Sequence, residues 1–161
     1  MRRKRQSGPI EAIDNGLFEI RLTADERATL LGFVDQLVEV MLAPPSDPRL
    51  RRLFPTAYHD NPEFDSEYQT YMRDELAQSR AASIQTVREV LSSEDPLTES
   101  QLYAFMTVLN SLRLVLGTLL DVDEADDLDL IPEDSPAYGQ AQLYEYLGWL
   151  LEWTVSALSG E

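Results

Sequence analysis

Apolar residues recur at intervals of three and four positions in four long segments, which is the pattern of helices with one buried face. The strongest case is the segment Leu102–Leu120, whose apolar stripe comprises Leu102, Phe105, Met106, Leu109, Leu112, Leu116, Leu119 and Leu120. Similar stripes run through residues 24–42, 62–92 and 136–158. The pattern therefore predicts four long helices.

Capping signals stand where these segments begin. Thr23–Glu26 and Thr98–Gln101 have the capping-box pattern, in which the first and fourth side chains each accept a hydrogen bond from the other's backbone N–H. Asn61-Pro62 and Ser135-Pro136 place a capping residue before a proline, and proline is favoured at the first helical position. Arg49–Phe54 is expected to form one short helical turn between the first two helices.

The residues before the first helix have the alternating pattern of a strand with one buried face. Phe18, Ile20 and Leu22 alternate with polar residues, and Asn15-Gly16 readily supplies the positive φ angles of a tight hairpin turn. We predict a two-stranded hairpin within residues 9–23. Because an isolated hairpin is only marginally stable, it should pack on the helices or pair with a second subunit through its open edge.

The helices are joined by connections of short to medium length, which favour antiparallel neighbours. The 161 residues are enough for one domain with its own core. We therefore predict a mainly α fold, an antiparallel bundle of four long helices with a small N-terminal β-hairpin. Residues 9–161 are expected to form this domain, and residues 1–8 a disordered basic tail.

One charged residue interrupts the apolar stripe of the third helix. Arg113 falls near the middle of that stripe, and a buried charge without a partner costs several kcal/mol. Among the acidic residues projected on the other helices, Glu75 lies nearest to an apolar face, close to Tyr68 and Tyr71. We therefore predict an ion pair between Arg113 and Glu75.

Two further polar residues lie near the same faces. Arg80 is close to the apolar line of the second helix, and Asn110 borders the side of the third helix that carries Arg113. With Arg113 and Glu75 they form either an internal polar network that fixes helix register or a site for a small anionic ligand. A closed core with Arg113 fully paired would favour the network, and an open pocket reaching Arg113 would favour the ligand site.

Charge is distributed unevenly along the chain. The formal net charge is −16, although four of the 13 basic residues are Arg2, Arg3, Lys4 and Arg5. Beyond residue 5, 9 basic and 29 acidic side chains leave a net charge of −20. Such a body repels nucleic acid, and four flexible cations attract it only weakly. We expect no direct binding to nucleic acid.

The residue types present argue against most catalytic chemistry. The chain has no cysteine, which excludes disulfides, thiolate nucleophiles and zinc–thiolate sites. His59 is the only histidine, and no nucleophilic triad or Gly-rich phosphate loop is recognisable. The acidic run Asp121–Asp129 fails the EF-hand pattern and is interpreted as a solvated loop. We expect no enzyme activity, no metal and no cofactor.

The sequence shows no sign of a membrane segment. No apolar run is long enough for a transmembrane helix. The basic start MRRKR is followed by SGPIEAIDNG, where a signal peptide would have an apolar stretch. We expect a cytoplasmic protein.

Two groups of residues are candidates for contact with a partner. Trp149 and Trp153 lie beside the main apolar stripe of the last helix, so they either fill a second core face or form a patch for a partner or a second copy. Arg49, Arg51 and Arg52 form the basic cluster outside the tail.

Four stretches resemble a known family: LFPTAYHDNPEF, MRDELAQSRAASIQTV, LTESQLYAFMTVLNSLRLVLGTLLDV and LYEYLGWLLE. They are similar to the small actinobacterial family of AosR-like proteins, long a domain of unknown function and often encoded beside the protease adaptor ClpS. The similarity covers nearly the whole chain, and its most specific part is LNSLRLVLG, which contains Asn110, Arg113 and Gly117.

The resemblance implies a non-enzymatic regulator of oxidative-stress transcription that acts through a protein partner, such as a sigma factor or another transcription component. Redox sensing in the family is attributed to a cysteine pair, which this chain lacks, so a disulfide switch does not carry over. The sequence alone leaves open whether the protein forms a homodimer. It also leaves open an alternative function, in which the protein binds or transforms a small ligand in a pocket around Arg113 and Glu75.

Overall fold

The computed structural model describes residues 8–41, 60–120, 132–135 and 138–160. In this part of the chain an N-terminal hairpin is followed by four α-helices: α1 (Ala24–Met41), α2 (Pro62–Leu91), α3 (Glu99–Leu120) and α4 (Tyr138–Ser159). The predicted mainly helical fold with a small hairpin is confirmed. The last helix begins at Tyr138, whose backbone N–H donates to the Ser135 carbonyl at 3.0 Å.

Both capping boxes form as predicted. At the start of α1, the Glu26 backbone N–H donates to the Thr23 hydroxyl at 3.1 Å, and the Thr23 N–H donates to the Glu26 carboxylate at 3.4 Å. At the start of α3, Thr98 and Gln101 exchange the same two bonds at 3.2 and 2.9 Å. These bonds satisfy N–H groups that have no partner within the helix, which is why both helices begin where the sequence indicated.

The hairpin consists of β1 (Ile10–Ala12) and β2 (Phe18–Ile20), paired antiparallel with Ile10 opposite Ile20. The turn between them, labelled η1, spans Asp14–Gly16. Asn15 and Gly16 have φ angles of 65° and 71°, the left-handed values that the Asn-Gly pair predicted.

The outer edge of β2 is paired rather than open. Phe18 and Leu97 exchange two backbone hydrogen bonds, at 2.8 and 2.7 Å, across the connection between α2 and α3. On the other side β1 packs against α4. Of the two alternatives that the sequence left open, the hairpin therefore packs on the helices.

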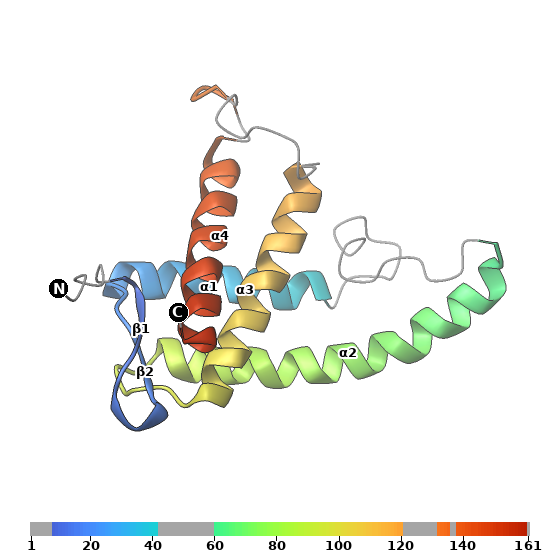
Figure 1. Ribbon diagram of the computed structural model, residues 1–161. Coiled ribbons are helices and arrows are strands. Elements are labelled where there is room, and N and C mark those ends of the chain that lie inside the picture. Colours follow the sequence, from blue (N-terminus) through green and yellow to red (C-terminus); the bar gives the residue numbers. More distant parts are fainter. Residues whose placement is uncertain (1–7, 42–59, 121–131, 136–137, 161) are drawn as a thin grey trace.

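The four helices are arranged as two antiparallel pairs (Figure 1). α3 and α4 lie side by side and run in opposite directions, and α1 and α2 run across them. α3 contacts each of the other three helices. The bundle is therefore crossed rather than aligned along one axis, and α3 is its central helix.

The core is built around α3. The predicted apolar stripe of this helix is buried at Leu102, Phe105, Leu109, Leu112 and Leu116, and Met106 is half-buried. Leu147 and Leu150 of α4 and Ile10 of β1 are at most 1% exposed and close the core from the other side. No helix in the described residues is both long and apolar enough to cross a lipid bilayer.

The first half of α2 lies outside this core. Figure 1 shows it extending beyond α3 and α4, and its Phe64 and Tyr71 side chains are 58% and 64% exposed. Ile84 and Val87, in the second half, are buried. The helix begins as predicted, because the Asn61 side chain accepts a hydrogen bond from the Phe64 backbone N–H at 3.2 Å.

Candidate functional site

The Arg113 side chain extends from α3 towards α4. Its guanidinium carbon lies 4.7 Å from the centroid of the Tyr144 ring, a cation–π contact. The Nε atom lies 3.3 Å from the position that a Cβ on Gly148 would occupy, so the glycine provides the space for this side chain. This Nε atom is buried and has no hydrogen-bond partner. Arg113 is therefore accommodated by an aromatic face rather than by a carboxylate.

Glu75 lies elsewhere, and the predicted Arg113–Glu75 ion pair is wrong: the ion pairs among described residues do not include it. Glu75 is exposed on α2 and accepts a hydrogen bond from the Tyr71 hydroxyl at 3.1 Å. This bond raises the pKa of the exposed Tyr71 above its ordinary value. The physical reason is the crossing of the helices, which leaves the first half of α2 outside the contact between α3 and α4.

Arg80 is held on a different side of α3. Its Nε donates to the Ser111 hydroxyl at 3.3 Å, and Ser111 donates to the Thr107 carbonyl at 3.0 Å. Burial lowers the pKa of Arg80. Residues 111 and 113 are separated by roughly 200° around the helix, so Arg80 and Arg113 face different neighbours. Among the described residues the two arginines therefore form neither the shared polar network nor the anion site that the sequence left open, and Asn110 is exposed.

Double-mutant cycles test whether Arg113 contacts Tyr144 rather than Glu75. We expect Arg113→Leu and Glu75→Gln to have additive effects on stability, within about 0.5 kcal/mol, because the two side chains are not in contact. Arg113→Leu and Tyr144→Leu should couple by about 0.5–2 kcal/mol through the lost cation–π contact. Urea unfolding of the single and double variants measures both terms. Strong coupling between Arg113 and Glu75 would contradict the structure.

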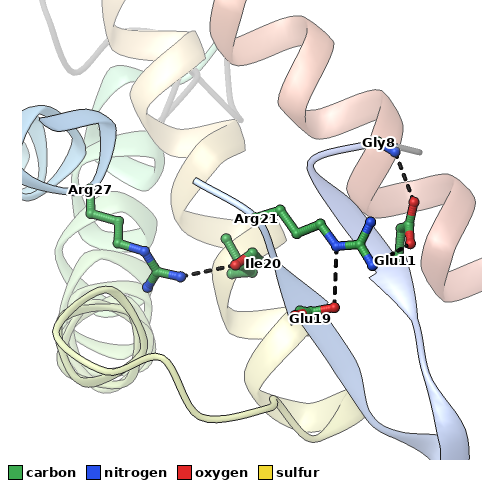
Figure 2. Close-up of polar contacts among 6 residues, drawn as sticks. All are labelled: Gly8, Glu11, Glu19, Ile20, Arg21 and Arg27. Atoms are coloured by element: carbon green, nitrogen blue, oxygen red, sulfur yellow. Dashed lines mark hydrogen bonds and ion pairs between the residues drawn. The ribbon is translucent and has the colours of Figure 1, made fainter. Parts of the chain in front are cut away.

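Arg27 bonds to four backbone carbonyls, although no pattern in the sequence marked it as a functional residue. From the first turn of α1 it donates to the carbonyls of Leu22 at 3.2 Å, Ile20 at 2.9 Å, Ser93 at 2.7 Å and Val90 at 3.4 Å (Figure 2 shows the bond to Ile20). Arg27 therefore joins β2, α1 and the end of α2.

Two of the acceptors of Arg27 lie at the C-terminal end of α2. The last carbonyls of a helix have no partner within it, and a cation near them is favoured by the helix dipole. Val90 and Ser93 lie at and just beyond the end of α2. Their carbonyls are 63 and 66 residues from Arg27 in sequence, so no local pattern could have indicated the contact.

Tyr146 of α4 bonds to the capping box of α1. Its hydroxyl donates to the Glu26 carboxylate at 2.8 Å. Burial and this bond together raise the pKa of Tyr146 well above its ordinary value, and the same bond is the main cause that lowers the pKa of Glu26. The Glu26 carboxylate thus caps the N-terminus of α1 and also accepts the hydrogen bond that links α1 to α4.

Tyr146→Phe should lower stability at neutral pH by about 1 kcal/mol, the usual net value of one hydrogen bond. A carboxyl whose pKa is lowered by folding contributes stability above its unfolded pKa and loses it as the pH falls. The ordinary pKa of glutamate is 4.5, so the difference in melting temperature between wild type and variant should shrink below that pH. Tyr103→Phe, at an exposed tyrosine, is the control and should show no such convergence.

The hairpin carries exposed ion pairs and one close packing contact. Arg21 pairs with Glu11 at 3.0 Å and with Glu19 at 3.2 Å (Figure 2 shows the three side chains). The Gly8 backbone N–H donates to Glu11 at 2.9 Å. A Cβ on Gly8 would lie 2.4 Å from the Trp153 ring, so only glycine fits there without a shift of the indole.

The two tryptophans have different surroundings. Trp153 is half-buried against the core and Gly8, whereas Trp149 is 45% exposed and its ring centroid lies 5.9 Å from that of Tyr146. The sequence left open whether the two tryptophans fill a second core face or form a surface patch, and each alternative applies to one of them. Trp153 fills a second core face, and Trp149 lies at the surface.

A cavity of about 410 Å³ lies among α1, α3 and α4. Its apolar lining includes six buried side chains, Leu37, Val40, Leu112, Val115, Leu116 and Leu147, together with the half-buried Phe33 and Leu143. Three exposed polar residues, Gln36, Glu39 and Gln140, are also among its described lining residues. The sequence placed Leu112 and Leu116 on a buried stripe, but no local pattern indicates that three helices leave a gap beside them.

Comparison with known proteins identifies the family. The family model described as "Domain of unknown function (DUF2017)" matches residues 3–158, almost the whole chain. The chain belongs to this family.

The chain is also similar to proteins of several mycobacteria. The chain is 26% identical over 132 residues to a protein of Mycobacterium tuberculosis named "Oxidative stress regulator AosR". It is 28% identical over 130 residues to a protein of Mycobacterium leprae named "Putative oxidative stress regulator AosR". These alignments cover 72% and 71% of this chain but only 60% and 59% of the relatives. The predicted AosR-like family is confirmed, and no solved structure matches the chain.

Several predicted features of this DUF2017 member lie outside the described residues. They are residues 1–7 of the basic tail predicted for residues 1–8, the helical turn predicted at Arg49–Phe54, the histidine His59 and the acidic run Asp121–Asp129.

Proposed function

We propose that this protein is a non-enzymatic regulatory module of the oxidative stress response and that it acts by binding a protein partner. The observation that carries the proposal is its similarity to proteins named as oxidative stress regulators over about 70% of its length. A sigma factor or another component of the transcription machinery is the proposed partner.

The surface of α4 supports a protein partner. Trp149 is 45% exposed, and large aromatic side chains at the surface are the commonest anchors of protein interfaces. Glu145 and Glu152 are exposed on the same helix. A partner surface with an apolar pocket and basic rim would complement this face, and its charge would speed association.

Charge also favours a partner over direct contact with DNA. The chain has 29 acidic residues against 13 basic ones, and specific DNA binding requires several phosphate contacts from lysine or arginine. Because the chain has no cysteine, its response to oxidants would run through the partner or through chemistry other than a disulfide.

A gel-shift series tests the route of regulation. The purified chain alone should not retard DNA in a sequence-specific way at physiological salt, whereas it should change the mobility of a promoter complex that contains the host's polymerase and sigma factor. Sequence-specific retardation by the chain alone at nanomolar concentration, where specific DNA binders act, would contradict the proposal.

The same assay locates the interface. We expect Trp149→Ala to weaken the effect on the promoter complex by about tenfold or more, as loss of an interface anchor does. Tyr103→Ala removes an aromatic side chain that is 47% exposed on α3 and is the matched control. Equal effects of the two substitutions would exclude Trp149 as the anchor.

A further inference from the structure

The cavity among α1, α3 and α4 exists because α1 and α4 both pack on α3 without packing along each other. The hydrogen bond between Tyr146 and Glu26 joins these two helices. The cavity lies towards the end of α1, between Phe33–Val40 of that helix and Gln140–Leu147 of α4. A molecule bound there would contact both helices.

The lining is that of a small-molecule site. Ligand cavities typically have volumes of about 300–1,000 Å³ and apolar walls with a few polar groups. This cavity has about 410 Å³ and eight apolar residues, six of them buried. Its apolar walls fit a hydrocarbon or aromatic body of modest size.

The polar residues of the lining indicate which polar head group a ligand would carry. Among the described lining residues, Glu39 carries a charge, and Gln36 and Gln140 contribute side-chain amides. None of the three side chains makes a hydrogen bond or ion pair among those described. Glu39 also lies in the last turn of α1, which contains no basic residue, so the negative end of the helix dipole adds to the carboxylate.

We propose that this cavity binds a small amphipathic cation, with its apolar body against Leu116 and Leu143 and its ammonium group at the Glu39 carboxylate. The amide oxygens of Gln36 and Gln140 would accept hydrogen bonds from the same head group. An anion would face Glu39 and the acidic body of the protein and would be repelled. The proposal is independent of the partner-binding role of Trp149.

Three probes with one hydrocarbon chain and different head groups test the proposal: octylammonium, octan-1-ol and octanoate. Isothermal titration calorimetry with the full chain should show binding in the order octylammonium, octan-1-ol, octanoate. We expect Glu39→Gln to weaken octylammonium by about tenfold, equivalent to about 1.4 kcal/mol, and to leave octan-1-ol within about twofold. Glu145→Gln, at an exposed glutamate of α4, is the matched control and should change neither.

A second variant tests the apolar part. Leu143→Trp fills the cavity from its half-buried wall and should weaken octylammonium and octan-1-ol alike by about tenfold or more. Its circular-dichroism spectrum and melting temperature verify that it folds. Equal loss of octylammonium binding in Glu39→Gln and Glu145→Gln would mean attraction to the acidic surface and would overturn the proposal. Octanoate binding as tight as octylammonium, or no heat from any probe, would also overturn it.

Discussion

Arg27→Ala is expected to lower the free energy of unfolding by about 3 kcal/mol, because several carbonyl groups lose charge-assisted hydrogen bonds at once. The four acceptors belong to β2, the connection to α1 and the end of α2. Their bonds to Arg27 are partly buried, so water replaces them incompletely. For a chain of this length the melting temperature should fall by roughly 6–12 °C.

Two further variants show whether the geometry of Arg27 matters or only its charge. Arg27→Lys keeps the charge but not the planar fork of donors, so it should recover less than half of the loss. Arg88→Ala removes another arginine, whose pair with Asp35 at 2.7 Å is exposed, and should cost less than about 1 kcal/mol. Similar losses for Arg27→Ala and Arg88→Ala would refute the role assigned to Arg27.

Phe105→Ala is expected to lower the free energy of unfolding by about 3–5 kcal/mol, at least as much as Arg27→Ala. Phe105 is 1% exposed and belongs to α3, the helix that contacts all three others. Its truncation removes buried apolar surface and leaves a cavity that the neighbouring helices cannot fill without moving. Urea unfolding should show a lower midpoint with an unchanged slope, since the residues that unfold are the same.

Tyr103→Ala is the control for this substitution because it lies on the same helix with its side chain 47% exposed. Its cost should stay within about 0.5 kcal/mol, as for most surface positions. A loss at Tyr103 comparable to that at Phe105 would mean that the outer face of α3 is also covered.

Features that depend on neighbouring residues could be predicted from the sequence. The capping boxes at Thr23 and Thr98 act within three residues of the helix start, and both formed. The Asn15-Gly16 turn depends on the φ angles of two residues, and both are positive. The apolar period of α3 depends only on helical geometry, and the leucines of its stripe from Leu102 to Leu116 are buried. Local hydrogen bonds, backbone angles and helical spacing therefore determined the elements.

The candidate site was predicted only in part. The sequence correctly marked Arg113 and Arg80 as unusual, since each lies at least partly inside an apolar interface. The predicted partner of Arg113, Glu75, was wrong, and Arg80 and Arg113 do not share the network or ligand site that the sequence left open. Helical projection tells which face a residue is on, but not which neighbouring helix covers that face or at what height it crosses.

The crossing of the two helix pairs was decided by the tertiary structure alone. It places Tyr144 and Gly148 beside Arg113, and it leaves Glu75 outside the core. It also brings the end of α2 within reach of Arg27 and opens a cavity at Glu39. These contacts join residues far apart in the chain. Each depends on how whole helices pack to bury their apolar faces, and that packing is not encoded in any single stretch of sequence.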